Sequence, residues 1–109
     1  MKNKTSVSHD EVLVKKLRKN RAFAIEYLKA AMEDTDEPHV LLIALRQVAE
    51  AHGGIAKVAK AAGIERESLY RALSRRGNPR LSTLFAVTKA MGLTLTVETG
   101  HPTRHGTSQ

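Results

Sequence analysis

The sequence predicts an all-α protein of about five helices that ends in one short β-strand. Between residues 20 and 91, apolar residues recur at spacings of three and four, which is the helical period. Glycines at Gly53, Gly54, Gly63 and Gly92 divide this stretch into segments of helix length. After Gly92 the apolar period changes to two, which is typical of a strand. A chain of 109 residues is expected to bury a single hydrophobic core.

The charged residues are unevenly distributed along the chain, which has a formal net charge of +7. Residues 1–21 contain seven of the eighteen basic residues and two acids, residues 26–37 contain five acids and one lysine, and residues 65–80 contain five arginines and two glutamates. A basic balance of this kind suits a polyanion such as a nucleic acid. We expect a basic N-terminal arm at residues 1–19, one folded domain at residues 20–98 and a disordered tail at residues 99–109.

Several classes of site have no pattern in this sequence. It contains no cysteine, which excludes disulfides and thiolate metal sites. The five histidines lack the i, i+4 pairing of a helical metal site, and there is no arrangement of catalytic residues. No apolar run approaches a membrane span of about 18 residues, and the N-terminal residues lack the apolar core of a secretion signal. We expect a cytoplasmic protein that is not an enzyme, with no metal, no cofactor and no membrane partner.

A helix is expected after Asn20, whose side chain is suited to an N-cap. Its apolar stripe contains Ile25, Leu28 and Met32, with Phe23 and Tyr27 beside it. The preceding residues 1–19 allow two structures, a short helix or an extended arm, and the pattern does not choose between them.

The next helix is expected from Pro38, which the first turn of a helix accepts. Asp36 is its expected N-cap, and Gly53 with Gly54 ends it. Its apolar positions include Leu41, Ala44, Leu45 and Val48. Because these and neighbouring apolar residues cover most of its circumference, the helix is expected to lie at the centre of the fold.

The segments "IAKVAKAA" and "RESLYRALS" predict two short helices separated by Gly63 and Ile64. The connection is so short that the two helices must cross steeply, and Gly63 supplies the positive φ that such a turn needs. The residues expected to face inward are Val58, Ala59, Ala62, Ile64, Leu69 and either Ala72 or Leu73. The pattern is that of a helix-turn-helix.

Outward positions of the second short helix carry residue types that read DNA. Arg66, Glu67 and Arg71 are the predicted base contacts in a major groove, because arginine can bond guanine O6 and N7 and glutamate can accept from cytosine N4. The predicted phosphate contacts are Lys57, Lys60, Ser68, Arg75, Arg76, Asn78 and Arg80. The alternative interpretation is a solvated helix face on which Glu65 and Glu67 balance the arginines.

A last helix is predicted to bury Leu81, Leu84, Phe85 and Met91. After it, Leu93, Leu95 and Val97 alternate with threonines and predict a strand. Since a single strand has no partner in a helical chain, we expect it to pair with the same strand of a second copy in a homodimer. The alternative is that this segment folds back on its own helices.

This order of elements resembles the addiction-module antidote family, the HigA-like antitoxins with a helix-turn-helix of the phage-repressor (Xre) type. The resemblance extends from Asn20 to Val97, and its most specific part is the run "ESLYRALSRRGNPRLSTLFAVTKAMGL". It implies a lambda-repressor-like fold and a transcriptional autorepressor that binds double-stranded operator DNA. It also implies neutralisation of a small basic RelE/HigB-like toxin that cleaves messenger RNA. By position, Arg66, Glu67 and Arg71 match the base-contact places of that family.

Two positions differ from the family pattern. Glu65 stands at the start of the second short helix, where relatives tend to have Ser or Thr, and Arg80 replaces a small capping residue before the next helix. Glutamate is a weaker N-cap than Ser or Thr, although its charge suits the helix dipole. The base contacts therefore stay open at this point.

A toxin surface is predicted from charge. A ribonuclease that holds RNA is usually basic, so the acidic segment of Glu33, Asp34, Asp36 and Glu37 could face it, while Phe23 and Tyr27 could supply apolar contacts. The alternative is a solvated loop beside a core helix. Three functions remain open: an antitoxin and autorepressor, a stand-alone phage-type regulator that binds only DNA, and a scaffold that uses the helix-turn-helix for protein contact.

Overall fold

The computed structural model describes residues 4–33 and 36–100, with side chains from Asp10 onward. Within these ranges the chain contains six α-helices and no strand. The helices are α1 (Lys4–Lys19), α2 (Arg21–Glu33), α3 (Pro38–Ala51), α4 (Ile55–Ala62), α5 (Arg66–Ala72) and α6 (Leu81–Ala90). The predicted all-α class is confirmed for the described ranges. The tail predicted at residues 99–109 lies outside them from residue 101.

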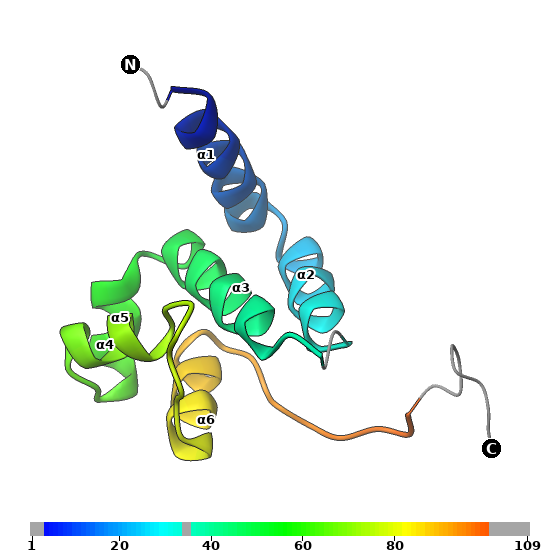
Figure 1. The fold of residues 1–109 in the computed structure, drawn as a ribbon, viewed down its shortest axis with the longest axis vertical. Coiled ribbons are helices and arrows are strands. Elements are labelled where there is room, and N and C mark those ends of the chain that lie inside the picture. The colour runs from blue at the N-terminus through cyan, green and yellow to red at the C-terminus, as the bar shows by residue number, and fades with distance from the viewer. Residues whose placement is uncertain (1–3, 34–35, 101–109) are drawn as a thin grey trace.

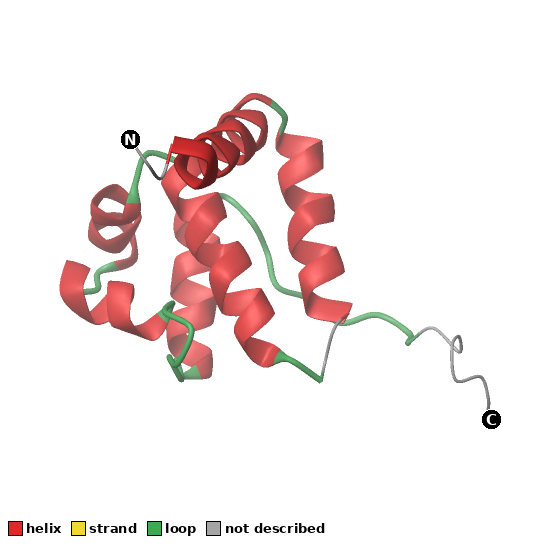
Figure 2. Cartoon of the chain, turned by 45° about the horizontal axis from the view of Figure 1, so that its top comes forward, coloured by secondary structure: helices red, strands yellow, loops and turns green. Residues whose placement is uncertain are grey.

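Helix α3 lies at the centre of the fold, as its apolar circumference predicts (Figure 1). It packs against α1, α2 and α4, and α4 packs in turn against α5 and α6. Helices α1 and α2 therefore lie on one side of α3, and the three short C-terminal helices lie on the other, as Figures 1 and 2 show.

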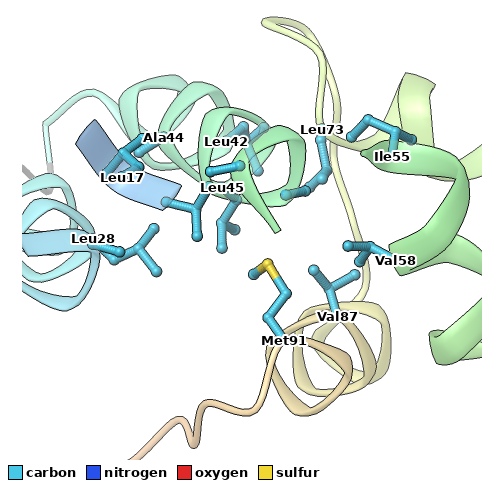
Figure 3. Close-up of a cluster of buried hydrophobic side chains, with 14 of the residues drawn as sticks. Leu17, Leu28, Leu42, Ala44, Leu45, Ile55, Val58, Leu73, Val87 and Met91 are labelled. Carbon is cyan, nitrogen blue, oxygen red and sulfur yellow. The ribbon is translucent and has the colours of Figure 1, made fainter. Parts of the chain in front are cut away.

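The core is one cluster of buried apolar side chains to which all six helices contribute. Figure 3 shows Leu45 of α3 facing Met91 and Leu28 across the centre of this cluster. The largest side chains with less than 2% exposure are Leu69, Leu73, Met91, Val58 and Val87. Val58, Leu69 and Val87 lie in α4, α5 and α6, and Leu73 and Met91 are the C-cap residues of α5 and α6. Truncating a buried leucine to alanine costs about 2–5 kcal/mol, so these short helices depend on their packing.

Residues 4–19 form a helix, so the structure has the first of the two alternatives for this segment. Leu17 is 3% exposed in the core, and Leu13 and Val14 pack against it on the same face. Val12 is 63% exposed because it points to the opposite side. The sequence could not choose because three consecutive apolar residues, 12–14, fit a helix and an extended chain equally well.

Helix α2 begins as predicted, with Asn20 Oδ1 accepting a hydrogen bond from the Phe23 backbone N–H at 3.0 Å. The predicted apolar stripe is wrong in part, because Ile25 and Met32 are 36% and 44% exposed. The buried stripe contains Ala24, Leu28 and Ala31. It is displaced by one position at either end, so that the small Ala24 and Ala31, rather than the larger Ile25 and Met32, are buried.

Helix α3 begins at Pro38, as predicted, but its N-cap is Glu37 and not Asp36. Proline disfavours helical backbone at the residue before it, and Glu37 has the non-helical φ of −133° and ψ of 79° that an N-cap needs. Its side chain makes no capping hydrogen bond. Gly53 and Gly54 end the helix with φ values of +106° and +103°, as expected.

Helix α6 buries a narrower stripe than predicted. Met91 is 1% exposed and Val87 is fully buried, but Leu81 and Phe85 are 63% and 49% exposed and Leu84 is half-buried. The prediction is therefore wrong for Leu81 and Phe85. Helix α6 packs mainly against α4, so its outer face stays open.

The predicted C-terminal strand is not seen. Residues 93–100 have no regular secondary structure. Leu93 packs against the core and Leu95 is half-buried, and the chain leaves the helices after them (Figures 1 and 2). A strand needs a second strand for its hydrogen bonds, and the described part of the chain offers none. Leu93 instead completes the end of α6, because its N–H donates to Thr88 O at 2.8 Å while that of Gly92 donates to Lys89 O at 2.9 Å.

Two arginines from the junction of α1 and α2 bind carbonyl oxygens at the ends of other helices. Arg21 Nη2 donates to Met91 O and Gly92 O, both at 3.0 Å, directly after α6. Arg18 Nε donates to Ala51 O, the last residue of α3, at 3.4 Å. A cation at a helix C-terminus is favourable both through the hydrogen bonds and through the helix dipole. These contacts fasten the N-terminal helices to α3 and α6.

The loop after α5 closes tightly against that helix. Gly77 N–H donates to Ser74 O at 2.9 Å, and the Ser74 hydroxyl donates to Arg71 O at 2.8 Å. A Cβ atom at residue 77 would lie 2.0 Å from the Ala72 carbonyl oxygen. Only glycine therefore fits at this position, and the loop lies directly on the last turn of α5.

Replacing Arg21 by alanine should lower the free energy of unfolding by about 1 kcal/mol, because both hydrogen bonds to the end of α6 are lost. Urea denaturation followed by circular dichroism measures this. Lys29→Ala, at an exposed position in the middle of α2, is the matched control and should leave the midpoint unchanged. Equal midpoints for Arg21→Ala and the native chain would show that these hydrogen bonds do not contribute to the free energy of unfolding.

Gly77→Ala should lower the free energy of unfolding by about 1–3 kcal/mol, because the added methyl group meets backbone atoms that have little room to move. Gly100→Ala is the control, since a Cβ there would meet nothing within 4 Å. The same urea titration compares the two variants. A Gly77→Ala midpoint equal to that of Gly100→Ala would contradict the close approach of the loop.

Candidate functional site

The turn between α4 and α5 is built by glycine and two backbone hydrogen bonds. Gly63 has φ +74°, which a side chain would strain. Its N–H donates to Lys60 O at 3.2 Å, and Ile64 N–H donates to Ala59 O at 2.9 Å. These bonds satisfy carbonyls at the end of α4 that would otherwise lack partners. The chain reverses within three residues and starts α5 at Arg66.

The inward side of the two short helices is as the sequence predicts. Val58 and Ala59 of α4 are 1% exposed, Leu69 of α5 is fully buried, and Ile64 packs half-buried against the core. Of the two alternatives at the end of α5, Leu73 is buried and Ala72 is half-buried. With its apolar side fixed against α4, α5 has one orientation relative to the core.

The outward side carries the predicted DNA-contact residues, in a part of the chain that we call the basic segment, Lys57 to Arg80. The exposed members are Lys57, Lys60, Arg66, Glu67, Arg71, Arg75, Arg76, Asn78 and Arg80. On α5, residues 67, 70 and 71 lie on the exposed side, away from Leu69 and Leu73, and Arg66 is exposed at the first position of the helix. The arginines here form no ion pair with any described carboxylate. Their charges are therefore free to face a polyanion.

The start of α5 places Glu65 and Ser68 against each other. Glu65 is the N-cap residue but makes no side-chain cap hydrogen bond, and Arg80 makes none at the start of α6. The Ser68 hydroxyl donates to Glu65 Oε1 at 3.1 Å. Ser68 is also half-buried. Its hydroxyl proton is therefore engaged by the Glu65 carboxylate, which weakens Ser68 as a phosphate contact.

The acidic segment lies at the connection between α2 and α3. Glu33 ends α2, Asp36 and Glu37 precede α3, and all three side chains are exposed. Glu37 Oε1 is 3.7 Å from His39 Nε2. Asp34, the fourth predicted toxin contact, lies outside the described residues. The three described carboxylates are exposed together at one end of the α2–α3 pair.

The two aromatic toxin-contact candidates are held by contacts inside the protein. Phe23 and Tyr27 are half-buried neighbours on α2, with ring centroids 6.1 Å apart, and Lys16 Nζ lies 4.8 Å from the centroid of the Phe23 ring. The Tyr27 hydroxyl donates to Gln47 Oε1, and Gln47 Nε2 donates to Asp10 Oδ1 at 3.4 Å.

Burial, and to a lesser degree the charge of Asp10, raises the pKa of Tyr27, so its hydroxyl stays a donor at neutral pH. The three side chains form a hydrogen-bonded chain that joins α2, α3 and α1. Tyr27 is thus a structural link between the helices as well as a candidate contact.

Sequence reasoning missed three features of these surfaces. It did not find the capping roles of Arg18 and Arg21, the close approach of Gly77 to α5, or the groove between α2 and α3 described below. All of them depend on contacts between distant parts of the chain, which the local pattern does not contain.

Within the described residues, no group of three or more His, Asp or Glu side chains is arranged to hold a metal ion. None of the helices in the same ranges is long and apolar enough to cross a bilayer.

Comparison with known proteins identifies the family. Residues 10–99 match the family model described as "Probable addiction module antidote protein". A relative from Haemophilus influenzae, described as an uncharacterized protein, is 39% identical over 72 residues, which are 66% of this chain and 72% of the relative. No solved structure matches the chain. The family model covers the core, the acidic segment and the basic segment, and the chain therefore belongs to the family of addiction module antidote proteins.

Proposed function

We propose that this chain is the antitoxin of a type II toxin-antitoxin module and the repressor of its own operon. It neutralises a RelE/HigB-like toxin that cleaves messenger RNA, and it binds operator DNA in the cytoplasm through α4 and α5, used as a helix-turn-helix of the Xre type. It acts by binding and not by catalysis. Membership of the antidote family supports the partner, and the basic segment supports the DNA.

One observation carries the DNA part of this proposal. Arg71 is exposed on the side of a short helix that faces away from the fully buried Leu69 and Leu73, and Arg66 is exposed at the first position of the same helix. A helix fixed in this way can enter a major groove with its side chains already oriented. Because no described carboxylate pairs with these arginines, the alternative of a face neutralised by Glu65 and Glu67 is less favoured.

The remaining cations suit the phosphate backbone. Arg75 and Arg76 follow α5 in a loop that Gly77 holds against that helix, and Arg80 stands directly before α6. Lys57 and Lys60 lie on the exposed side of α4. Phosphate contacts from both sides of a recognition helix fix its register without reading sequence. Asn78 is exposed in the same loop, and Ser68 is a weakened contact because its hydroxyl donates to Glu65.

A homodimer is part of the proposal. A single module of this size buries only about 600–1,000 Å² on DNA, so two copies on a near-palindromic operator with half-sites about 34 Å apart would bind more tightly. Leu93, Leu95 and Val97 are the proposed dimer residues. Leu93 and Leu95 are half-buried on their own chain, whereas Val97 is 92% exposed and open to a second copy.

The toxin surface is proposed on the opposite side of α3 from the basic segment. Glu33, Asp34, Asp36 and Glu37 would face the basic toxin, with Tyr27 nearby and Phe23 partly covered by Lys16. Opposite charge at a contact steers two proteins together and excludes like-charged partners. The stand-alone regulator remains the second candidate, and it differs from the antitoxin in having no protein partner.

Arg66→Ala and Arg71→Ala should each weaken operator binding by about 10- to 100-fold, the effect of losing a bidentate arginine–guanine contact of about 1–3 kcal/mol. Each variant should lose the most affinity for operators that carry the native base at the position its arginine contacts. It should lose little affinity for operators in which that base is already changed. Fluorescence anisotropy with a set of operator variants measures both effects.

Arg75→Ala should instead weaken binding to all sequences alike and lower the slope of log K against log salt by about 0.9. Lys29→Ala, an exposed cation on α2, is the control for net charge and should change neither quantity. If every arginine variant lost the same affinity for all DNA sequences, the arginines would act only as a charged surface, and the proposed base contacts would be wrong.

Reversing the four acids at residues 33, 34, 36 and 37 to lysine should abolish toxin neutralisation, because a basic toxin would then meet like charge. Growth of cells that express the product of the adjacent gene together with each variant measures neutralisation. Operator binding by the same variant is the control for folding and should be retained. Full neutralisation by the reversed variant would mean that these acids are only a solvated loop.

A further inference from the structure

An open groove of about 340 Å³ lies between α2 and α3, on the side of α3 away from α5 and α6. This volume is at the lower end of the range of about 300–1,000 Å³ that is common for binding pockets. The lining residues that carry the argument are Ala30, Ala31, Val40, Ile43 and Ala44. The groove is thus formed by apolar side chains from two neighbouring helices.

The groove exists because small residues face each other between these helices. Ala31 and Ala44 are buried and form its floor, and Val40 and Ile43 are half-buried along α3. Ala30 of α2 is exposed at the edge. Larger side chains would fill the space between the two helices, as they do elsewhere in the core. An apolar surface is therefore left accessible to a partner.

The two ends of the groove are polar and differ from each other. At one end, Tyr27 and Gln47 are joined by a hydrogen bond. At the other end lies His39, which is 3.7 Å from the Glu37 carboxylate. Because Glu33 ends α2 and Asp36 and Glu37 precede α3, the exposed carboxylates stand at this end of the groove. We call Glu33, Asp36 and Glu37 the acidic rim.

The combination of an apolar floor and an acidic rim specifies the chemistry of the partner. Shallow grooves between helices bind amphipathic helices, whose apolar residues at positions i, i+3 and i+4 enter the groove. Lysine or arginine beside those positions would complement the acidic rim, and an acidic partner would be repelled. A nucleic acid is excluded by the same carboxylates.

We propose that this groove is the docking site for an amphipathic, basic helix of the toxin, which places one apolar side chain over Ala31 and Ala44 and its cations against the acidic rim. The inference rests on the proposed function, because it identifies where the toxin of that proposal binds. In this arrangement the main apolar contacts with the toxin are made by the alanines and Ile43 of the groove. Phe23 contributes less, because Lys16 partly covers its ring.

Filling the groove tests the inference. Ala30→Trp adds a large side chain at an exposed position of α2 that lines the groove. The purified product of the adjacent gene, titrated by calorimetry, should bind this variant at least about tenfold more weakly than the native chain. Ala22→Trp is the matched control, because residue 22 is an exposed alanine of the same helix outside the groove. It should bind like the native chain.

Ala30→Arg provides a second variant in case tryptophan disturbs folding, since an exposed arginine is readily solvated on a helix. It should also weaken binding at least about tenfold, because its charge repels a basic partner, while Ala22→Arg should not. Thermal melting followed by circular dichroism should give the same transition for all four variants within a few degrees.

The outcomes separate the two proposals. If the native chain does not bind the adjacent gene product, the proposed toxin neutralisation fails and the groove has no such partner. If the native chain binds and both Ala30 variants bind equally well, the docking site is wrong while the antitoxin function stands. Weaker binding of the Ala30 variants, with normal binding of the Ala22 variants, supports the groove.

Discussion

The burial of α3 from several sides is the constraint on which the rest of the fold depends. Its buried residues face α1 and α2 in one direction and α4 in another, so no single partner helix could cover it. The N-terminal helices are held in place by more than apolar contact, because Arg18 and Arg21 bind the carbonyl ends of α3 and α6. One helix therefore organises two groups of elements that share a single core.

The division around α3 also separates two surfaces of opposite charge. The basic segment is carried by α4, α5 and the loop that follows, and the acidic rim stands at the connection of α2 and α3. A polyanion at the first surface would be repelled from the second, and a basic protein would show the reverse preference. The proposed antitoxin would bind DNA and a basic toxin at surfaces that this fold, centred on one buried helix, keeps apart.

The DNA-facing helix of the proposal is stable only through its surroundings. Helix α5 has seven residues, Arg66–Ala72, and an isolated helix of this length would not persist in water. Leu69 and Leu73 anchor it from within, Gly63 sets the turn that precedes it, and Gly77 lets the following loop close against it. The absence of a side-chain cap at Glu65 is tolerated because tertiary packing stabilises the helix.

The sequence by itself determined the helical class, the central position of α3, the Asn20 cap, the turn at Gly63 and the inward positions of α4 and α5, because these follow from local spacing, capping and glycine conformation. Only the tertiary structure decided that Ile25, Met32, Leu81 and Phe85 are exposed, that residues 93–100 form no strand, and that Arg21 reaches the end of α6. The physical reason is that the helical period identifies which residues lie on the apolar face of a helix. Which of those residues are buried depends on where helices from distant parts of the chain pack against that face. The groove between α2 and α3 belongs to the second class, since it is made by residues that are adjacent only after folding.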